Sequence, residues 1–350
     1  MAKQDNILST IQNNSNLLEV NGLIKEYPVS SAGFKSHKFR AVDYVSFVTQ
    51  PGQTLALVGE SGSGKSTIGR CLLGLTHASQ GTIRFQGQEI QRLNEHGFRR
   101  FRKHIQKVFQ NPIDSFNPRM KIGEALKEPL QLRQELPKAH YQAEAVRLLE
   151  QVGLNDRYLE RYPAQMSGGQ LQRVGVARAM APHPELIFLD EPTSALDISI
   201  RGQIVNLLLD QQQKLNLSYI LVTHDLRVVK FMAHQIAVMY LGQFVEIGSN
   251  AVIFANPLHP YTQGLFAAIM LGELGTRERR RVFQLQGEVL RRDPTYKGCR
   301  LVRRCHFAQE ACKTEQQLRE LRPGHWVRCW RAEEIEQELQ ENLKFDNQIQ

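Results

Sequence analysis

The chain has 350 residues, 41% of them hydrophobic, and a formal net charge of +9 at pH 7. This length predicts one large core with a smaller appendage. No segment approaches the roughly 20 apolar residues of a membrane span, and residues 1–16, expected to be flexible, lack the charged-then-apolar layout of a signal peptide. The composition therefore argues against an integral membrane protein and predicts a cytoplasmic one.

The positive charge gathers in short basic clusters, the densest at residues 99–104 and 277–281. No base-stacking aromatic residues alternate with these lysines and arginines, as a nucleic-acid surface would favour. A solvated basic surface is the favoured interpretation. Proximity to anionic lipid headgroups is the alternative, and nucleic-acid binding ranks last.

A glycine-rich run lies between an apolar strand expected at residues 54–58 and a helix expected at residues 68–75. It fits the pattern G-x-x-x-x-G-K-[ST], in which backbone N–H groups at a helix N-terminus bind phosphate. Lys65 is expected to reach the β- and γ-phosphates, and the Ser66 hydroxyl to bind Mg²⁺. The predicted phosphate loop comprises Gly59, Glu60, Ser61, Gly62, Ser63, Gly64, Lys65, Ser66 and Thr67.

Two carboxylates, Asp190 and Glu191, end an apolar run at residues 186–189 that reads as a buried central strand. Ligands of parallel sheets bind at the carboxyl ends of strands. Asp190 is expected to hold Mg²⁺ through a water. Glu191 is expected to orient or deprotonate an attacking water.

Two further polar residues follow apolar strands. Gln110 comes after a strand ending at Val108, and its amide is placed to reach Mg²⁺ or the attacking water. His224 follows the apolar run at residues 218–222 and is expected to donate a hydrogen bond to the γ-phosphate. The predicted catalytic residues are therefore Glu191, His224 and Gln110, and the predicted Mg²⁺ ligands are Ser66, Gln110 and Asp190.

The order of these motifs, together with Met166-Ser-Gly-Gly-Gln170 and Ser194-Ala-Leu-Asp197, resembles that of ATP-binding-cassette (ABC) ATPases over residues 17–257. The resemblance implies an α/β P-loop fold. Its parts are a RecA-like core sheet with helices, an antiparallel β subdomain and an α-helical subdomain at about residues 112–165. ATP and Mg²⁺ are the implied cofactors.

The same resemblance implies roles for residues outside the phosphate loop. A signature segment, residues 167–170, would bind the γ-phosphate of ATP held by an opposite cassette. Tyr27 would stack on adenine, and Asp197 would lie in the loop between cassettes. The implied signature residues are Ser167, Gly168, Gly169 and Gln170.

Residues 109–120 and 256–262 are similar to segments of the ATPases of oligopeptide, dipeptide and nickel importers, especially the second, F-type subunit. This implies ATP-driven peptide uptake, with nickel, metal-chelate or haem uptake as alternatives. A nucleic-acid ATPase is disfavoured because only residues 66–167 separate the phosphate loop from the signature segment. The implied partners are a related second ATPase forming a heterodimer, two permease subunits and an external substrate-binding protein. The implied location is the cytoplasmic face of the inner membrane.

Four of the five cysteines fall in a C-terminal extension at residues 258–331, and Cys71 reads as buried packing. A cytoplasmic compartment disfavours disulfides, so four thiolates suggest zinc or an iron–sulfur cluster. The importer resemblance implies a [4Fe–4S] cluster, with zinc or free thiols as alternatives. The candidate ligands are Cys299, Cys305, Cys312 and Cys329. Residues 332–350 are expected to form an amphipathic terminal helix and tail, with Ile335, Leu339 and Leu343 on its apolar stripe.

Overall fold

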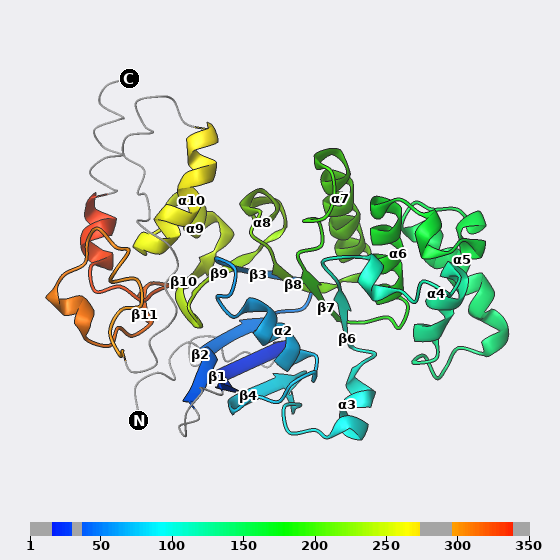
Figure 1. The fold of residues 1–350 in the computed structure, drawn as a ribbon, viewed down its shortest axis with the longest axis horizontal. Helices are drawn as coiled ribbons and strands as arrows, with labels where there is room; N and C mark the ends of the chain where they lie inside the picture. The colour runs from blue at the N-terminus through cyan, green and yellow to red at the C-terminus, as the bar shows by residue number, and fades with distance from the viewer. Residues whose placement is uncertain (1–15, 30–36, 274–295, 339–350) are drawn as a thin grey trace.

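A computed structural model of the protein describes residues 16–29, 37–273 and 296–338 (Figure 1). Its central element is an eight-stranded sheet in which β3, β6, β7, β8 and β9 run parallel, and β10, β11 and β12 continue the sheet in antiparallel pairing. The predicted α/β fold is confirmed. In spatial order the strands are β11 (Arg319–Arg322), β12 (His325–Val327), β10 (Gln243–Ser249), β9 (Gln235–Tyr240), β3 (Thr54–Val58), β8 (Ser218–Val222), β7 (Leu186–Asp190) and β6 (Ile105–Val108).

The central strands β3 and β8 are buried along their whole length. Their sequences are continuous apolar runs because helices cover both faces of the parallel sheet. The covering helices include α2 (Lys65–Leu72), α7 (Ile198–Leu215), α8 (Leu226–Met232), α9 (Asn250–Ala255) and α10 (Pro260–Glu273).

A separate four-stranded antiparallel sheet packs its apolar face against α2. Leu18, Val45 and Phe85 are buried there with Ile68 of α2. Its strands, in spatial order, are β2 (His37–Thr49), β1 (Leu18–Val29), β4 (Gln80–Phe85) and β5 (Gln88–Glu89). The short helix α3 (Glu95–Phe101) leads from this sheet to β6.

A helical subdomain lies beyond β6, at the right of Figure 1. Its helices share one buried apolar cluster, which includes Leu126, Leu148 and Val174. The elements are η1 (Ile113–Ser115), α4 (Ile122–Leu130), η2 (Lys138–His140), α5 (Tyr141–Gln151), η3 (Asp156–Glu160), η4 (Pro163–Gln165) and α6 (Gly168–Met180).

The C-terminal extension lies at the opposite side of the molecule, where β12 pairs with β10 and so joins the core sheet. Glu246 of β10 is fully buried there and receives hydrogen bonds from the Leu258 and His259 amides at 2.8 and 2.9 Å. His325 Nε2 lies 2.7 Å from the same carboxylate. The extension is therefore built onto the cassette through buried polar contacts as well as strand pairing.

Residues 332–338 are helical, and Ile335 packs against Leu258, Val327 and Ala332. Leu339 and Leu343 lie outside the described residues, as do the basic cluster at 277–281 and residues 1–15 of the flexible N-terminus expected at residues 1–16. Across the described ranges, no helix has the length and apolar character needed to cross a membrane.

Candidate functional site

The phosphate loop connects β3 to α2, as its sequence predicts. Gly64 caps α2 with a φ of 113°, and a Cβ at this position would stand 2.5 Å from the Ala41 carbonyl oxygen. Only glycine fits such a backbone without strain. The tight turn brings the N-terminus of α2, with its partial positive charge, to the end of a central strand.

Lys65 curls back into this loop and is nearly buried. Its Nζ donates hydrogen bonds to the Gly59 carbonyl at 2.8 Å, the Glu60 carbonyl at 2.9 Å and Ser63 Oγ at 3.1 Å. Burial lowers the pKa of Lys65, whereas Glu191 and Asp190 act in the opposite direction. An incoming phosphate would compete for this ammonium. Ser66 and Ser61 are exposed, on the accessible side of the loop.

The structure brings three predicted catalytic side chains together at the ends of β6, β7 and β8. Gln110 Nε2 donates to Glu191 Oε2 at 3.0 Å, and His224 Nδ1 lies 3.3 Å from Glu191 Oε1. The Glu191 backbone has a φ of 46° and donates its N–H to the Val222 carbonyl. A positive φ is uncommon for a residue with a Cβ and marks a backbone held by its surroundings. Here it turns the carboxylate toward its two polar neighbours.

Asp190 has a partner that sequence reasoning missed. Lys107 Nζ, from β6, lies 2.7 Å from Asp190 Oδ2, and the same ammonium lies 4.6 Å from the centre of the Phe109 ring. The sequence signal was available, because Lys107 is a charged residue within β6, three residues before Gln110. Asp190 is therefore charge-paired in this structure. A Mg²⁺ ion would have to share it with Lys107.

The signature segment begins α6, in the helical subdomain. Ser167 and Gln170 form a reciprocal cap: Ser167 Oγ accepts from the Gln170 amide at 3.3 Å, and Gln170 Oε1 accepts from the Ser167 amide at 3.1 Å. Gly168 and Gly169 add N–H groups at this helix start. Figure 1 shows α6 at the right and α2 below the core sheet. The signature segment and the phosphate loop of one chain are therefore separated in space. Asp197 occupies the position directly before α7, and its side chain makes no capping hydrogen bond to this helix.

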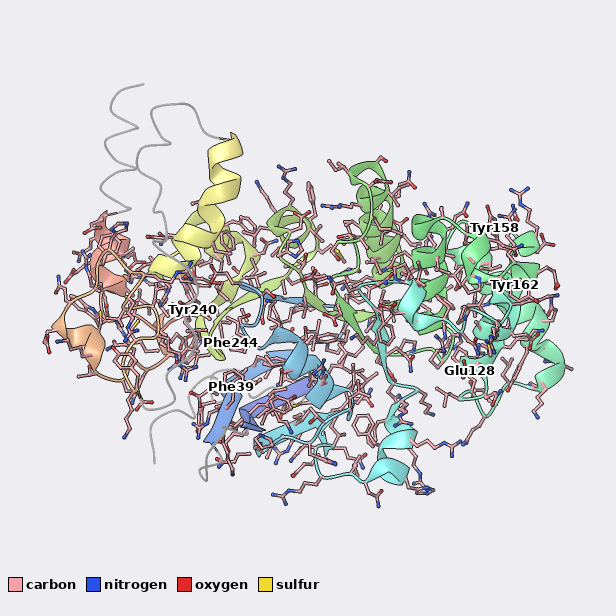
Figure 2. The ribbon with its side chains drawn as sticks, in the orientation of Figure 1. Phe39, Glu128, Tyr158, Tyr162, Tyr240 and Phe244 are labelled. Atoms are coloured by element: carbon pink, nitrogen blue, oxygen red, sulfur yellow. The ribbon has the colours of Figure 1, made fainter. Side chains whose placement is uncertain are left out.

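Tyr27 lies on β1, half-buried, with Lys25 Nζ 4.9 Å from its ring centre. It pairs across the strands with Phe39 of β2, which is labelled in Figure 2. The Phe39 residue is 42% exposed. An aromatic ring that stays this exposed is available for stacking. Phe39 is therefore a second candidate for adenine contact that sequence reasoning missed.

All four late cysteines line one small cavity in the extension, together with His259, Trp330 and Arg331. Cys312 Sγ accepts a hydrogen bond from Trp330 Nε1 at 3.1 Å, and none of the four is in a disulfide. Burial raises the pKa of Cys299 to about 11 and that of Cys329 to about 12. The donor set suits a metal in kind and number. However, among the residues the structure describes, no three His, Cys, Asp or Glu side chains are arranged to hold a metal ion.

Comparison with known families gives two matches. Residues 42–194 match the model described as "ABC transporter", and residues 245–312 match "Oligopeptide/dipeptide transporter, C-terminal region". The chain is 40% identical over 325 residues to the oligopeptide transport ATP-binding protein AppF of Bacillus subtilis (strain 168), covering 91% of this chain and 98% of that protein.

A second relative and a solved structure extend the comparison. The chain is 46% identical over 275 residues to the glutathione import ATP-binding protein GsiA of Shigella flexneri serotype 5b (strain 8401), covering 78% of this chain and 44% of that protein. Its fold is similar to the dimeric post-hydrolysis state of the ATP-binding cassette MJ0796 bound to ADP and Pi, with a TM-score of 0.60 and 26% identity. That likeness covers 67% of this chain and 98% of the other.

Proposed function

Because this chain belongs to the ABC transporter ATP-binding proteins of the oligopeptide and dipeptide class, we propose that it binds and hydrolyses ATP to energise peptide uptake across a membrane. The observation that carries the proposal is the meeting of Gln110, Glu191 and His224 at the strand ends, on the same sheet as the phosphate loop. The relatives' names concern oligopeptides and glutathione, which are all peptides. A nickel, metal-chelate or haem cargo and a nucleic-acid role are therefore not favoured.

The residues present suit ATP and Mg²⁺. We propose that Lys65 and the N–H groups of the phosphate loop bind the β- and γ-phosphates. Ser66, Asp190 and Gln110 supply the oxygen ligands that Mg²⁺ prefers. The amide nitrogen of Gln110 is used by Glu191, so its oxygen is the atom offered to the metal. Glu191 orients or deprotonates the attacking water, and His224 contacts the γ-phosphate.

We propose that ATP is enclosed between two cassettes, one offering its phosphate loop and the other its signature segment. The separation of α6 from α2 within one chain supports this arrangement (Figure 1), as does the dimeric state of the similar cassette. The N–H groups at the start of α6 then meet a phosphate from the partner's site. A related second ATPase, two permease subunits and an external binding protein complete the transporter. This chain lies peripherally on the cytoplasmic face of the membrane.

Reconstitution tests the proposed function. The chain, its second ATPase and the permeases are placed in proteoliposomes, and ATP-driven uptake of a labelled di- or oligopeptide is measured with the binding protein present. Uptake that depends on ATP and on this chain is expected. Uptake of Ni²⁺ or haem with none of peptide would overturn the peptide assignment. Absence of ATP binding by the purified chain would overturn the function itself.

For the four cysteines we propose a [4Fe–4S] cluster, with zinc as the alternative. Their number, their chemistry and their shared cavity support it, although the side chains must move closer to reach one metal group. Anaerobic purification followed by iron, sulfide and zinc analysis separates the cases. Iron and sulfide in equal amounts with a visible absorption band are expected. Zinc alone, or no metal, would refute the cluster.

A further inference from the structure

We propose that Arg304 of the extension is a positioning residue of the ATP site, which acts through Glu60 of the phosphate loop and thereby sets the affinity for ATP. The inference rests on the proposed role of this loop in ATP binding. It goes further by assigning part of the binding energy to a residue outside the ATP-binding cassette.

The first observation is a two-pronged ion pair. Arg304 Nη1 lies 2.9 Å from Glu60 Oε2, and Arg304 Nη2 lies 3.0 Å from Glu60 Oε1. The Arg304 side chain is only 7% exposed and that of Glu60 27%. Paired charge-assisted hydrogen bonds of this geometry are directional as well as strong. They therefore hold the Glu60 carboxylate in one orientation.

The second observation is that the backbone of Glu60 is also held from outside the loop. Its N–H donates to the hydroxyl of Tyr261, on α10, at 2.8 Å. The Tyr261 ring is fully buried against Tyr240 of β9, with ring centres 4.6 Å apart. Arg304 lies over the same Tyr240 ring, 5.9 Å from its centre. Glu60 is thus held at two points by one cluster of side chains. Tyr261 binds its amide, and Arg304 binds its carboxylate.

The third observation links the contacts of Glu60 to Lys65, the residue expected to bind phosphate. The Glu60 carbonyl accepts a hydrogen bond from Lys65 Nζ at 2.9 Å. The position of Glu60 therefore helps to set the conformation of the phosphate loop and the position of the Lys65 ammonium. Without Arg304, the Glu60 carboxylate would be an unpaired negative charge in the loop that is proposed to receive a triphosphate, with Lys65 as its remaining electrostatic partner. Like charges near a protein surface repel one another by Coulomb's law. By pairing with Glu60, Arg304 removes that repulsion.

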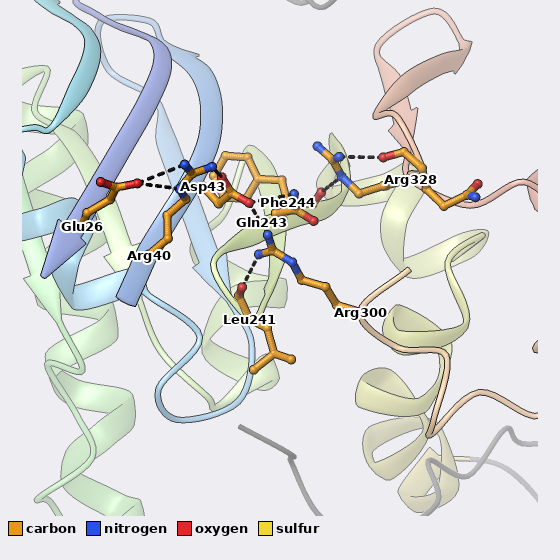
Figure 3. Close-up of polar contacts among 9 residues, drawn as sticks. Glu26, Arg40, Asp43, Leu241, Gln243, Phe244, Arg300 and Arg328 are labelled. Carbon is orange, nitrogen blue, oxygen red and sulfur yellow. Dashed lines mark hydrogen bonds and ion pairs between the residues drawn. The ribbon is translucent and has the colours of Figure 1, made fainter. Parts of the chain in front are cut away.

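The extension is docked independently of this contact, which supplies matched controls. Arg300 donates to Asp43 and to the Leu241 carbonyl, and Arg328 Nε donates to the Phe244 carbonyl at 2.8 Å (Figure 3). These bonds anchor the extension to the cassette, and none of them is made directly to the phosphate loop. Arg303, the residue adjacent to Arg304, is exposed. Arg300→Ala therefore tests loosened docking, together with any effect passed through the Leu241–Gly242 peptide, whose N–H donates to the Ser63 carbonyl at 2.8 Å. Arg303→Ala tests loss of a positive charge alone.

The experiment measures MgATP binding by the purified full-length chain, and KM and kcat in the assembled transporter. We expect Arg304→Ala to weaken binding about 10- to 100-fold, the range for losing charge-assisted hydrogen bonds. KM rises in parallel, whereas kcat at saturating ATP stays within about twofold, because the groups around Glu191 are untouched. Arg303→Ala binds like the wild type, and Arg300→Ala weakens binding less than Arg304→Ala.

The decisive arm is a double-variant cycle. If repulsion from Glu60 is the cause, Glu60→Gln restores most of the affinity lost in Arg304→Ala, so the double variant binds ATP nearly as well as Glu60→Gln alone. Additive losses, or wild-type binding by Arg304→Ala, would overturn the proposal. If Arg304→Ala does not fold, Arg304→Lys replaces it in the cycle, with an intermediate loss expected and wild-type affinity counting against the idea. A wild-type chain that binds no ATP would instead refute the proposed function.

Discussion

The Glu191 carboxylate is held between two side chains from neighbouring strand ends: His224 Nδ1 lies 3.3 Å from one oxygen, and Gln110 Nε2 donates to the other at 3.0 Å. Both partners lie far from Glu191 in the sequence. The parallel pairing of β6, β7 and β8 brings the three together. A carboxylate steered in this way is suited to orient a water.

Glu191→Gln should retain ATP binding and lose hydrolysis by about 10²- to 10⁴-fold, the usual contribution of a positioned base. The amide keeps the shape and the hydrogen-bond acceptor but cannot take a proton. Steady-state phosphate release and bound-nucleotide analysis by gel filtration measure the two effects. An ATP-loaded dimer is the expected product. Undiminished turnover would remove Glu191 from its assigned role.

Lys65→Ala should weaken ATP binding itself by about 10- to 100-fold, because a charge-assisted contact to phosphate is lost. Calorimetric titration with MgATP measures the change. Lys214→Ala serves as the matched control, since that lysine is exposed on α7 and should leave the affinity unaltered. Equal binding by the two variants would contradict the phosphate-loop assignment.

His325→Ala should lower the free energy of unfolding by about 1–3 kcal/mol, since it leaves the buried Glu246 carboxylate with one partner fewer. Urea unfolding gives the change. His140→Ala, at an exposed position in η2, is the control and should fall within about 0.5 kcal/mol of the wild type. A destabilisation equal to that of the control would mean that the Glu246 contact contributes nothing.

Acid should destabilise the fold partly through His234. Thr54 N donates to His234 Nδ1 at 3.0 Å, and partial desolvation lowers the pKa of this histidine, although part of its surface stays exposed. The contribution to stability is therefore present above the unfolded-state value of about 6.5 and is lost as the pH falls through the lower folded-state pKa. Thermal midpoints between pH 7 and 5 should fall less steeply in His234→Asn, whose amide oxygen can accept the Thr54 bond without titrating. Parallel curves for the two proteins would argue against this role.

The parts of the site that the sequence predicted are those in which local sequence decides local structure. The phosphate loop has its glycines where the backbone needs them, and Asp190 and Glu191 end an unmistakable buried strand. What sequence reasoning missed depends on tertiary contact. Lys107 meets Asp190, and Arg304 meets Glu60 across 244 positions of sequence.

The strand pairing of the extension with the core sheet is a further contact that the sequence did not predict. β12 has only three residues, too few for a periodic signal, and its place in the core sheet comes from pairing with β10. The cysteine spacing indicated a shared site, and the four side chains do line one cavity. Their distances from one another depend on how the loops pack, which no spacing rule supplies.

The pairing of β12 with β10 also affects where the protein can be truncated for biochemical work. A protein truncated after residue 257 would lose β12, so β10 would become an edge strand with unpaired backbone groups. Exposed edge strands of this kind promote aggregation. The truncation would also remove the His325 side chain, which contacts the buried Glu246 carboxylate. We therefore expect a cassette that lacks the extension to be less stable than the full chain, so activity assays are best made on the full-length protein.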